Sequence, residues 1–363
     1  MRTTLRIYFL DVGQGDCSLI VLPDNTGILV DCKDEFAATE LMRWQQIDHL
    51  RAIVVTHLDR DHIAGVPHLL SNFFKRRTGT GDPEYPLRQL DSIWIEEDRT
   101  RGNLTEVGHQ LLELALARAR DADVAQMVPT RDGLPTLDPR PKPVWPLHEG
   151  GDWAVELLLP FHTTRREHFM RFGAEGNPVS AAVRVRHGQQ RVIIGGDATL
   201  GCFEDLFDLD SEQVRANVVR SPHHGGDVLH GTRAWDDYSD FYKHSAPEIV
   251  VHSVGTSNAH SHPLAAHVRG STRAGSCHVM CTQLTAQCHG DVDDVRLRTS
   301  HLSLDGTYPH RNRARRGAQR ARPPSTPCAG TVLVSLDGEA MTFYPSAEDH
   351  GDLVLQLDHP LCR

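Results

Sequence analysis

Short runs of apolar residues, separated by polar turns, recur along the chain and predict β-strands. The run Ala52–Val55 is nearly continuous, which indicates a strand buried on both faces. Gly13 and Gly15 lie in the turn after the first run, where glycine permits positive φ and close backbone approach. The predicted strands are Leu5–Leu10, Ser18–Leu22, Gly27–Cys32, Ala52–Val55, Ser92–Ile95, Ala154–Leu159, Ala182–Arg186, Arg191–Ile194, Val218–Val219, Ile249–His252, His278–Met280, Thr331–Leu336 and Ala340–Tyr344.

Apolar residues at helical spacing follow several of these strands and predict helices. We expect helices at Glu35–Trp44, Ile63–Phe74, Leu104–Arg120, Gly201–Leu206 and Leu264–Arg269. Strands that alternate with helices, together with hairpins, indicate a mixed α/β fold built in layers.

Three polar segments interrupt this pattern. Lys75–Pro86 is rich in glycine and proline, which predicts a surface loop. The prolines of Asp132–Pro146 argue against regular structure there. Asp291–Pro327 is rich in arginine and poor in apolar residues, which predicts a flexible insertion. We therefore expect residues 1–363 to form a single domain, with an Arg-rich flexible insertion at 291–327.

The composition is that of an ordinary globular protein, since 39% of the 363 residues are hydrophobic. The formal net charge of −10 argues against duplex DNA binding over the whole surface, so nucleic-acid contact must be local. No run of about 18 apolar residues occurs, so we expect no transmembrane helix and no membrane partner. The first residues lack the charged and apolar regions of a signal peptide, so we expect a cytoplasmic protein.

Cysteines gather late in the chain, at Cys277, Cys281, Cys288 and Cys328. Thiols stay reduced in the cytosol, and thiolates suit a structural zinc site. Their spacing is irregular compared with paired C-x2-C ligands, so buried free thiols are the alternative.

The strongest chemical signal lies directly after the predicted buried strand Ala52–Val55. His57, Asp59, Asp61 and His62 place four potential metal ligands within six residues. Loops at the carboxyl ends of strands are where open α/β folds build their sites, and this spacing can serve two metals. The alternative is a solvated polar turn in which Asp61 caps the next helix.

Further potential ligands follow other predicted strands. Asp197 comes after Arg191–Ile194, the pair His223 and His224 follows Val218–Val219, and His262 follows Ile249–His252. Each of these residues alone has a structural alternative, such as a turn carboxylate or a surface imidazole. Their recurrence at strand ends in one chain favours a metal site.

These motifs resemble the metallo-β-lactamase superfamily, and in particular the soluble nuclease-like domain of the ComEC competence DNA-uptake proteins. Phe9–Asp16 resembles that group's opening motif, and His57-x-Asp59-x-Asp61-His62 resembles its variant of the HxHxDH motif. Asn177 and Ser180 lie where that group has an Asn…Ser pattern. The chain departs from the group in reading His-His-Gly-Gly after Pro222, and it lacks the membrane channel, so DNA import is not implied.

The resemblance implies an αββα metallo-β-lactamase-type sandwich with surface insertions and a two-metal site on one edge. The ligands that it implies are His57, Asp59 and His223 for one metal, Asp61, His62 and His262 for the other, and Asp197 as the bridge. Either His223 or His224 could be the ligand of that pair, and the sequence leaves this choice open.

The remaining site residues receive roles in catalysis or substrate binding. We expect catalytic roles for Asp61, His224 and Asp16, with Asp16 orienting a ligand histidine and His224 contacting a phosphate or protonating the leaving group if His223 binds metal. We expect the substrate-binding residues to be Asn177, Ser180 and Asn258.

Three carboxylates among the ligands make the site harder than an all-histidine site. We therefore expect two divalent metal ions, with Mn²⁺ favoured and Zn²⁺ or Mg²⁺ as alternatives. Two metals about 3.5–4 Å apart can clamp the attacking and leaving oxygens of a phosphodiester and activate a water molecule.

The favoured function is a metal-dependent nuclease or phosphodiesterase acting on DNA or RNA, and a role in defence against foreign DNA fits it. The alternatives are a hydrolase of a small phosphoester, cyclic nucleotide or lactone on the same site, and a non-enzymatic scaffold. The expected partners are nucleic acid as substrate and a regulatory partner or activating protease, because an unrestrained nuclease would harm its host.

Overall fold

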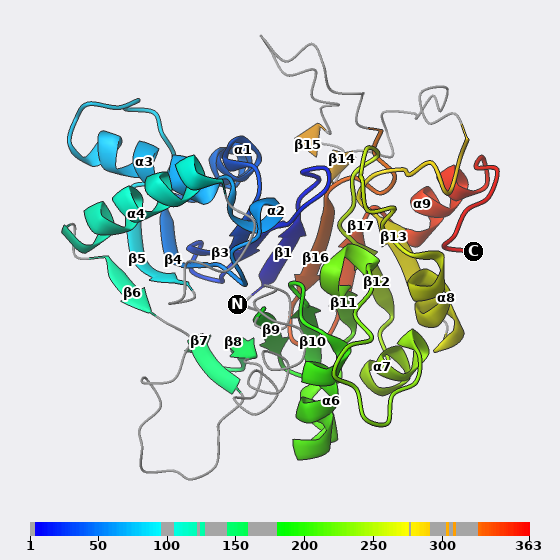
Figure 1. The fold of residues 1–363 in the computed structure, drawn as a ribbon. Coiled ribbons are helices and arrows are strands. Elements are labelled where there is room, and N and C mark those ends of the chain that lie inside the picture. The colour runs from blue at the N-terminus through cyan, green and yellow to red at the C-terminus, as the bar shows by residue number, and fades with distance from the viewer. Residues whose placement is uncertain are drawn as a thin grey trace.

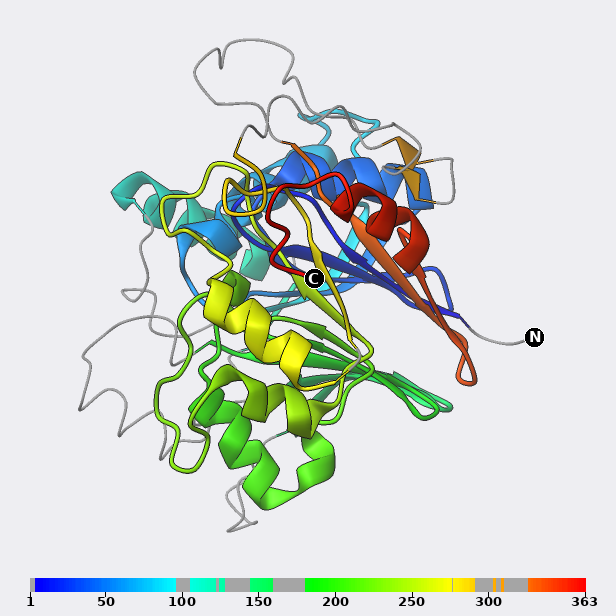
Figure 2. The same ribbon diagram turned by 90° about the vertical axis from the view of Figure 1, so that its right-hand side faces the viewer.

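Two β-sheets pack face to face, with helices on the outer face of each, in the computed structural model of the chain (Figures 1 and 2). This αββα arrangement confirms the expected metallo-β-lactamase-type sandwich. The structure describes residues 4–95, 105–121, 124–127, 144–158, 180–275, 277–290, 303–304, 308–309 and 326–363.

The first sheet has the strand order β17-β16-β1-β2-β3-β4-β5-β6. Its strands run antiparallel from β17 to β3 and parallel from β3 to β6. The strands are β1 (Leu5–Phe9), β2 (Cys17–Val21), β3 (Gly27–Cys32), β4 (His49–Val54), β5 (Gln89–Trp94), β6 (Ala125–Met127), β16 (Val332–Leu336) and β17 (Met341–Tyr344). The helices of this half are α1 (Glu35–Gln45), α2 (Arg60–Ile63), α3 (Val66–Arg77) and α4 (Glu106–Asp121).

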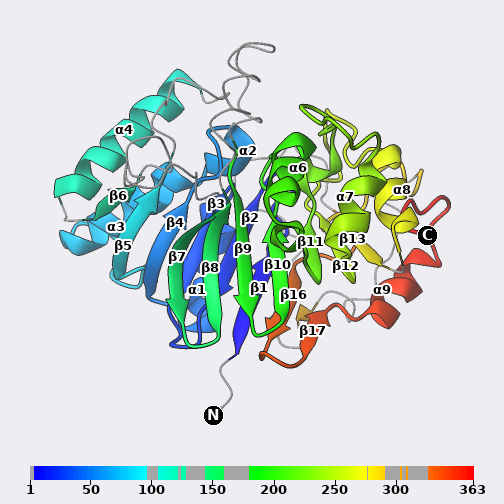
Figure 3. The same ribbon diagram turned by 90° about the horizontal axis from the view of Figure 1, so that it is seen from below.

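The second sheet has the order β13-β12-β11-β10-β9-β8-β7, and Figure 3 shows part of it in front of the first sheet. Its strands are β7 (Val144–Gly150), β8 (Trp153–Leu158), β9 (Ala182–His187), β10 (Gln190–Ile194), β11 (Val218–Arg220), β12 (Ile249–His252) and β13 (His278–Cys281). The helices of this half are α6 (Leu200–Leu209), α7 (Tyr238–Ser245), α8 (Ala265–Arg273), α9 (Ala347–Val354) and the 3₁₀ turns η2 (Ser211–Gln213) and η3 (Pro222–Gly225). A separate pair is formed by β14 (Ser303–Leu304) and β15 (Tyr308–Pro309).

The alternation of side chains along β1 explains how one strand serves two cores. Ile7 and Phe9 face the second sheet and pack in the core between the sheets, whereas Tyr8 and Leu10 face the helices of the first half. Successive side chains of a strand point to opposite faces, so a strand in the middle layer must be apolar on both.

Most predicted elements are confirmed within about two residues, but the predicted helix Ile63–Phe74 corresponds to α3, which begins only at Val66, and a separate short helix, α2, ends at Ile63. The break falls at Gly65, whose N–H donates to the carbonyl of Cys32 at 2.7 Å. A Cβ at Gly65 would lie 2.8 Å from that carbonyl oxygen, so only glycine lets the chain pass this close to β3. This contact holds the loop from His57 to His62 above the end of β3.

The prediction that Asp132–Pro146 has no regular structure is wrong at its end. Strand β7 begins at Val144 and contains Pro146. Because β7 is the end strand of its sheet, proline costs no ladder hydrogen bond on its open side, and the pairing shifts register between Pro146 and His148. Residues 128–143 lie outside the described residues, as does most of 291–327, where we expected a flexible insertion.

The glycine-rich turn before β2 ties the two halves together. Asp16 N–H donates to the carbonyl of Asp61 at 2.8 Å, and the Ser253 hydroxyl donates to the carbonyl of Gly15 at 2.9 Å. Gly15 has φ of 139°, and a Cβ there would lie 2.4 Å from the Asp61 carbonyl. The turn therefore fixes the loop that carries Asp61 against the loop that follows β12.

None of the helices among the described residues is both long and apolar enough to cross a membrane.

Truncation of Phe73 tests the packing of α3 on the first sheet. Phe73 is fully buried, so Phe73→Ala should lower the free energy of unfolding by about 3–5 kcal/mol through lost burial and a residual cavity. Phe36→Ala is the matched control because Phe36 is 56% exposed, and its effect should stay within about 0.5 kcal/mol. Urea unfolding measures both, and equal losses would show that α3 does not pack as described.

Candidate metal centre

Asp197 lies at the centre of the predicted ligands. It follows β10 after two glycines, is almost fully buried, and its N–H donates to the Ser180 hydroxyl at 2.9 Å. Its Oδ2 atom lies 3.4 Å from His57 Nε2 and 3.8 Å from His223 Nε2. Its Oδ1 atom lies 3.0 Å from His62 Nε2 and 3.8 Å from His224 Nε2. One carboxylate therefore faces two pairs of imidazoles through different oxygens.

The other two acidic residues of the motif extend these two sets. Asp59 Oδ2 lies 3.9 Å from His57 Nε2, on the Oδ2 side of Asp197. Asp61 Oδ2 lies 3.3 Å from His224 Nε2, on the Oδ1 side. The structure thus brings together the four residues of the motif His57-x-Asp59-x-Asp61-His62, called the HxDxDH motif below.

Both His223 and His224 face the site, whereas the sequence left open which of the two is a metal ligand. His223 and His224 have φ of 52° and 55°, so two successive residues adopt the left-handed region. This conformation is costly for non-glycine residues and persists only where the surroundings hold it. It allows neighbouring side chains to reach the two oxygens of the same carboxylate.

His262 borders the site on the far side of these two imidazoles. Its ring centroid lies 5.1 Å from that of His223 and 6.1 Å from that of His224. Asn258 Oδ1 accepts from the His262 N–H at 2.8 Å, and Asn258 Nδ2 donates to the His262 carbonyl at 2.9 Å. We expected Asn258 to bind substrate. Both ends of its side-chain amide are instead hydrogen-bonded to the backbone of His262 and hold that loop.

Ser180, the second expected substrate contact, lies beneath the site. It is fully buried, and its hydroxyl accepts from Asp197 N–H and lies 3.4 Å from His57 Nδ1. This hydroxyl therefore positions Asp197. The third expected contact, Asn177, lies outside the described residues.

Asp31 is a functional residue that the sequence analysis missed. Its Oδ2 lies 2.8 Å from His62 Nδ1 and accepts from the Thr56 hydroxyl, and its Oδ1 accepts from the Thr56 N–H, each at 2.8 Å. With Nδ1 bound to Asp31, the ring of His62 turns Nε2 toward Asp197. The available signal was a carboxylate inside the apolar run Gly27–Cys32, where a buried charge requires a partner.

Asp16 occupies the position expected of an orienting residue. It is almost fully buried, and its oxygens lie 3.0 Å from His224 Nδ1 and 3.5 Å from His62 Nδ1. It also forms an ion pair with the buried Arg220. Asp16 thus contacts one imidazole from each half of the molecule.

The electrostatics of the site favour the ionised form of two of its carboxylates, Asp197 and Asp61. Burial alone would raise the pKa of Asp197, but the nearby His62, His57 and His224 hold that pKa well below its usual range. Burial alone would also raise the pKa of Asp61, but hydrogen bonding to His224 and the nearby His62 and His224 together lower it. Burial lowers the pKa of His62, yet Asp197 and Asp31 raise it well above 6.5. The carboxylates around His62 thus favour positive charge at this position.

The donor atoms fit metal ions on a second ground. Several buried atoms of the site lack a hydrogen-bond partner of normal geometry, and His57 Nε2, His62 Nε2, His224 Nε2 and Asp197 Oδ1 are among them. Within the described part of the chain, one group of potential ligands has atoms that all lie within 4.8 Å of one another: Asp16, His62, Asp197 and His224. Buried polar atoms without partners are costly, and bound cations would satisfy them.

The late cysteines lie elsewhere, beside α9. Cys281, Cys288 and Cys328 pack in a small apolar cluster, whereas the Cys277 thiol donates to the carbonyl of Ser271. These thiols form no group of ligand atoms within 4.8 Å of one another among the described residues. The observed packing favours buried thiols over the structural zinc hypothesis.

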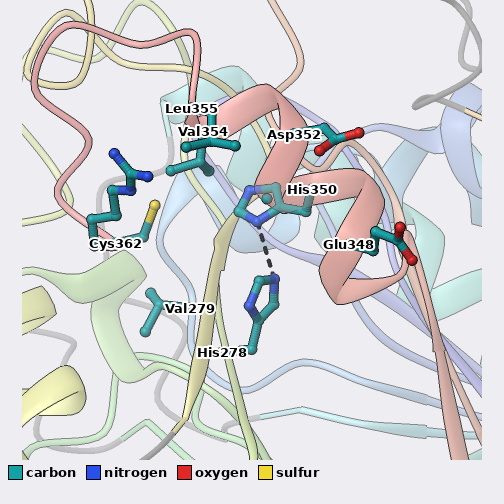
Figure 4. A pocket seen from close by; sticks show the side chains of 10 residues that line it. His278, Val279, Glu348, His350, Asp352, Val354, Leu355 and Cys362 are labelled. Atoms are coloured by element: carbon teal, nitrogen blue, oxygen red, sulfur yellow. Dashed lines mark hydrogen bonds between the residues drawn. The ribbon is translucent and has the colours of Figure 1, made fainter.

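A cavity of about 380 Å³ lies next to this cluster, between β13 and α9 (Figure 4). His350 Nδ1 lies 3.1 Å from His278 Nε2, and its Nε2 lies 3.3 Å from Cys328 Sγ. Burial lowers the pKa of His350 to about 3, so the ring is neutral. A neutral ring can accept from the Cys328 thiol through Nε2 and donate to His278 through Nδ1, so both of its nitrogens have a protein partner.

Removal of the missed carboxylate tests its role in holding His62. Asp31→Asn keeps the size of the side chain but removes its charge. Metal affinity should therefore fall about 10–100-fold, the usual effect of removing a residue that is hydrogen-bonded to a metal ligand. Isothermal titration of the metal-free protein with Mn²⁺ measures the loss. Asp91→Asn is the control, since Asp91 pairs with His49 at 2.8 Å on the surface of the same sheet. An unchanged affinity in Asp31→Asn would contradict the assignment.

Several known proteins resemble this chain. YhfI from Bacillus subtilis, a metallo-β-lactamase fold protein, is 13% identical over 76% of this chain and 96% of its own, with a TM-score of 0.42. Tm1679, a metal-dependent hydrolase of the β-lactamase superfamily, is 14% identical over 76% of this chain and 95% of its own, also with a TM-score of 0.42. Comparison with curated proteins gives no match.

The family itself is shown by a sequence model that describes the metallo-β-lactamase superfamily and matches residues 10–241. That span includes the turn before β2, the HxDxDH motif, Asp197 and the His-His pair. The match covers more than half of the chain, and the two-sheet architecture agrees with it. The chain therefore belongs to the metallo-β-lactamase superfamily.

Proposed function

We propose that this metal-dependent hydrolase of the metallo-β-lactamase superfamily cuts phosphodiester bonds in DNA or RNA. The observation that carries the proposal is the placement of Asp197, whose two oxygens face two separate sets of ligand-type side chains. A carboxylate in this position can bridge two cations, and paired cations are suited to stabilise both the attacking and the leaving oxygen at phosphorus.

The proposed ligand sets follow the distances. His57, Asp59 and His223 would hold one metal ion on the Oδ2 side of Asp197. On the Oδ1 side the second ion would be held by Asp61, His62 and His224, with His262 on the outer edge. The bound ions would supply Lewis acidity and an ionised water at neutral pH.

The protein's own residues would prepare this chemistry. Asp31 is hydrogen-bonded to His62 Nδ1, and Asp16 lies 3.0 Å from His224 Nδ1, so that the Nε2 atoms of both rings are directed to the centre. The site is open to solvent on one face, where the side chains of Asp59 and Asp61 are 20% and 23% exposed. A phosphodiester would approach from that face.

The resemblance of the motifs to the nuclease-like domain of ComEC proteins supports nucleic acid as the substrate. The three carboxylates Asp59, Asp61 and Asp197 support Mn²⁺ as the working ion, since hard oxygen ligands favour it relative to zinc. A regulatory partner or an activating protease would belong to the same proposal, because free nuclease activity is toxic to the cell.

Loss of a ligand tests the proposed activity directly. Labelled single- and double-stranded DNA and RNA are incubated with the protein in Mn²⁺, Mg²⁺ and Zn²⁺, beside small phosphoesters, cyclic nucleotides and lactones. Asp61→Ala and His62→Ala should each lower the rate of hydrolysis more than about 100-fold. Loss of a metal ligand should cost more than loss of a residue that only orients a ligand. Asp352→Ala, on the exposed side of α9, is the control. Hydrolysis of a small ester with no cleavage of nucleic acid would replace the nuclease by the small-molecule hydrolase.

A change of ligand type tests the metal preference. Asp59→His replaces a hard oxygen ligand by an imidazole, so activity should shift toward Zn²⁺ relative to Mn²⁺. Asp59→Asn removes the charge without adding an imidazole and separates the two effects. Activity is measured for each metal after chelation and reconstitution. A Mn²⁺ to Zn²⁺ ratio equal to that of the wild type would show that Asp59 is not a ligand.

A further inference from the structure

Arg220 is a charged side chain buried beneath the metal centre. It ends β11 and is only 1% exposed. Its guanidinium forms an ion pair with Asp16, although Nη1 and Nη2 make no hydrogen bond of normal geometry among the described residues. A buried guanidinium is costly unless its partner is held in place, so this pair joins two otherwise separate elements.

The pair crosses from one sheet to the other. Arg220 belongs to β11 in the second sheet, and Asp16 immediately precedes β2 in the first sheet. The guanidinium contacts Asp16, whose oxygens lie 3.0 Å from His224 Nδ1 and 3.5 Å from His62 Nδ1.

Arg220 and His224 also hold the same carboxylate from two ends of a short loop. The loop from Arg220 to His224 contains both left-handed residues, and it connects the end of β11 to the His-His pair. Asp16 thus lies between the two ends of a loop whose backbone is in a conformation unfavourable for histidine. The contacts at Asp16 and the hydrogen bond from the His223 N–H to the Gly196 carbonyl at 2.8 Å together hold this left-handed segment.

We propose that Arg220 is a positioning residue, which holds Asp16 so that His224 presents Nε2 to the second metal ion. This inference rests on the proposed function for the identity of the ligands. It assigns to Arg220 the task of keeping Asp16 in place between two imidazoles, one from each half of the molecule. Arginine suits this task because its planar fork fixes the orientation of a carboxylate, which a lysine ammonium does not.

The test compares three variants by titration of metal-free protein with Mn²⁺. Arg220→Met removes the charge at similar length and should weaken binding of one of two ions about 10–100-fold. Arg220→Lys keeps the charge without the fork and should recover part of the affinity. Arg184→Met is the matched control, because Arg184 is also buried in the second sheet and pairs with Glu156 at 2.8 Å, away from the metal centre. It should bind both ions as the wild type does.

A spectroscopic measurement separates positioning from general stability. Nitrogen-15 NMR of the metal-free protein reports which ring nitrogen of His224 carries the proton, and His224→Gln assigns the signal. We expect Nδ1 protonation in the wild type and in Arg184→Met, and a mixture of tautomers in Arg220→Met. Should Arg220→Met not fold, Arg220→Lys decides the question by the same two measurements.

Unchanged Mn²⁺ affinities and an unchanged His224 tautomer in folded Arg220→Met or Arg220→Lys would overturn the proposal. Equal effects of Arg184→Met would also overturn it, because the losses would then follow from stability alone. Neither measurement uses a substrate. A wild-type protein that binds two ions but cuts no nucleic acid would therefore contradict the proposed function and leave the role of Arg220 intact.

Discussion

The concentration of buried negative charge around Asp197 is the constraint on which the rest of the structure depends. Asp16, Asp31 and Asp197 are each at most 2% exposed, and burial of a carboxylate is costly unless charged or polar partners surround it. The imidazoles, Arg220 and the Thr56 backbone supply those partners. These partners lie at strand ends or in tight loops, and the topology brings those strand ends together at one edge of the two sheets.

The fold was largely predictable from sequence because its strands are short, apolar on both faces and bounded by turns. The predictions that were wrong have physical causes that the local pattern of apolar residues does not show. The split of α2 from α3 arises from a close contact between Gly65 and β3, and β7 tolerates Pro146 because it is an end strand. Helices α7 and α9 were missed, since their amphipathic faces are short and their polar residues include histidine.

The candidate site was predictable as a set of residue types but not as a geometry. The order of motifs identified His57, Asp59, Asp61, His62 and Asp197, which the structure brings together. The sequence could not show that His223 and His224 both face Asp197, because this depends on successive left-handed residues. Nor could it show Asp31 or Arg220, whose partners are distant along the chain.

The division of ligands between the two halves has a consequence for folding. The first half supplies the HxDxDH loop, and the second supplies Asp197 and the His-His pair, so a bound cation would contact both across the interface between the sheets. Any ligand that binds only the native state stabilises it in proportion to the logarithm of its concentration. Metal availability would thus set how tightly the two halves are joined, and metal-starved cells would contain a more easily unfolded and degraded form of the protein.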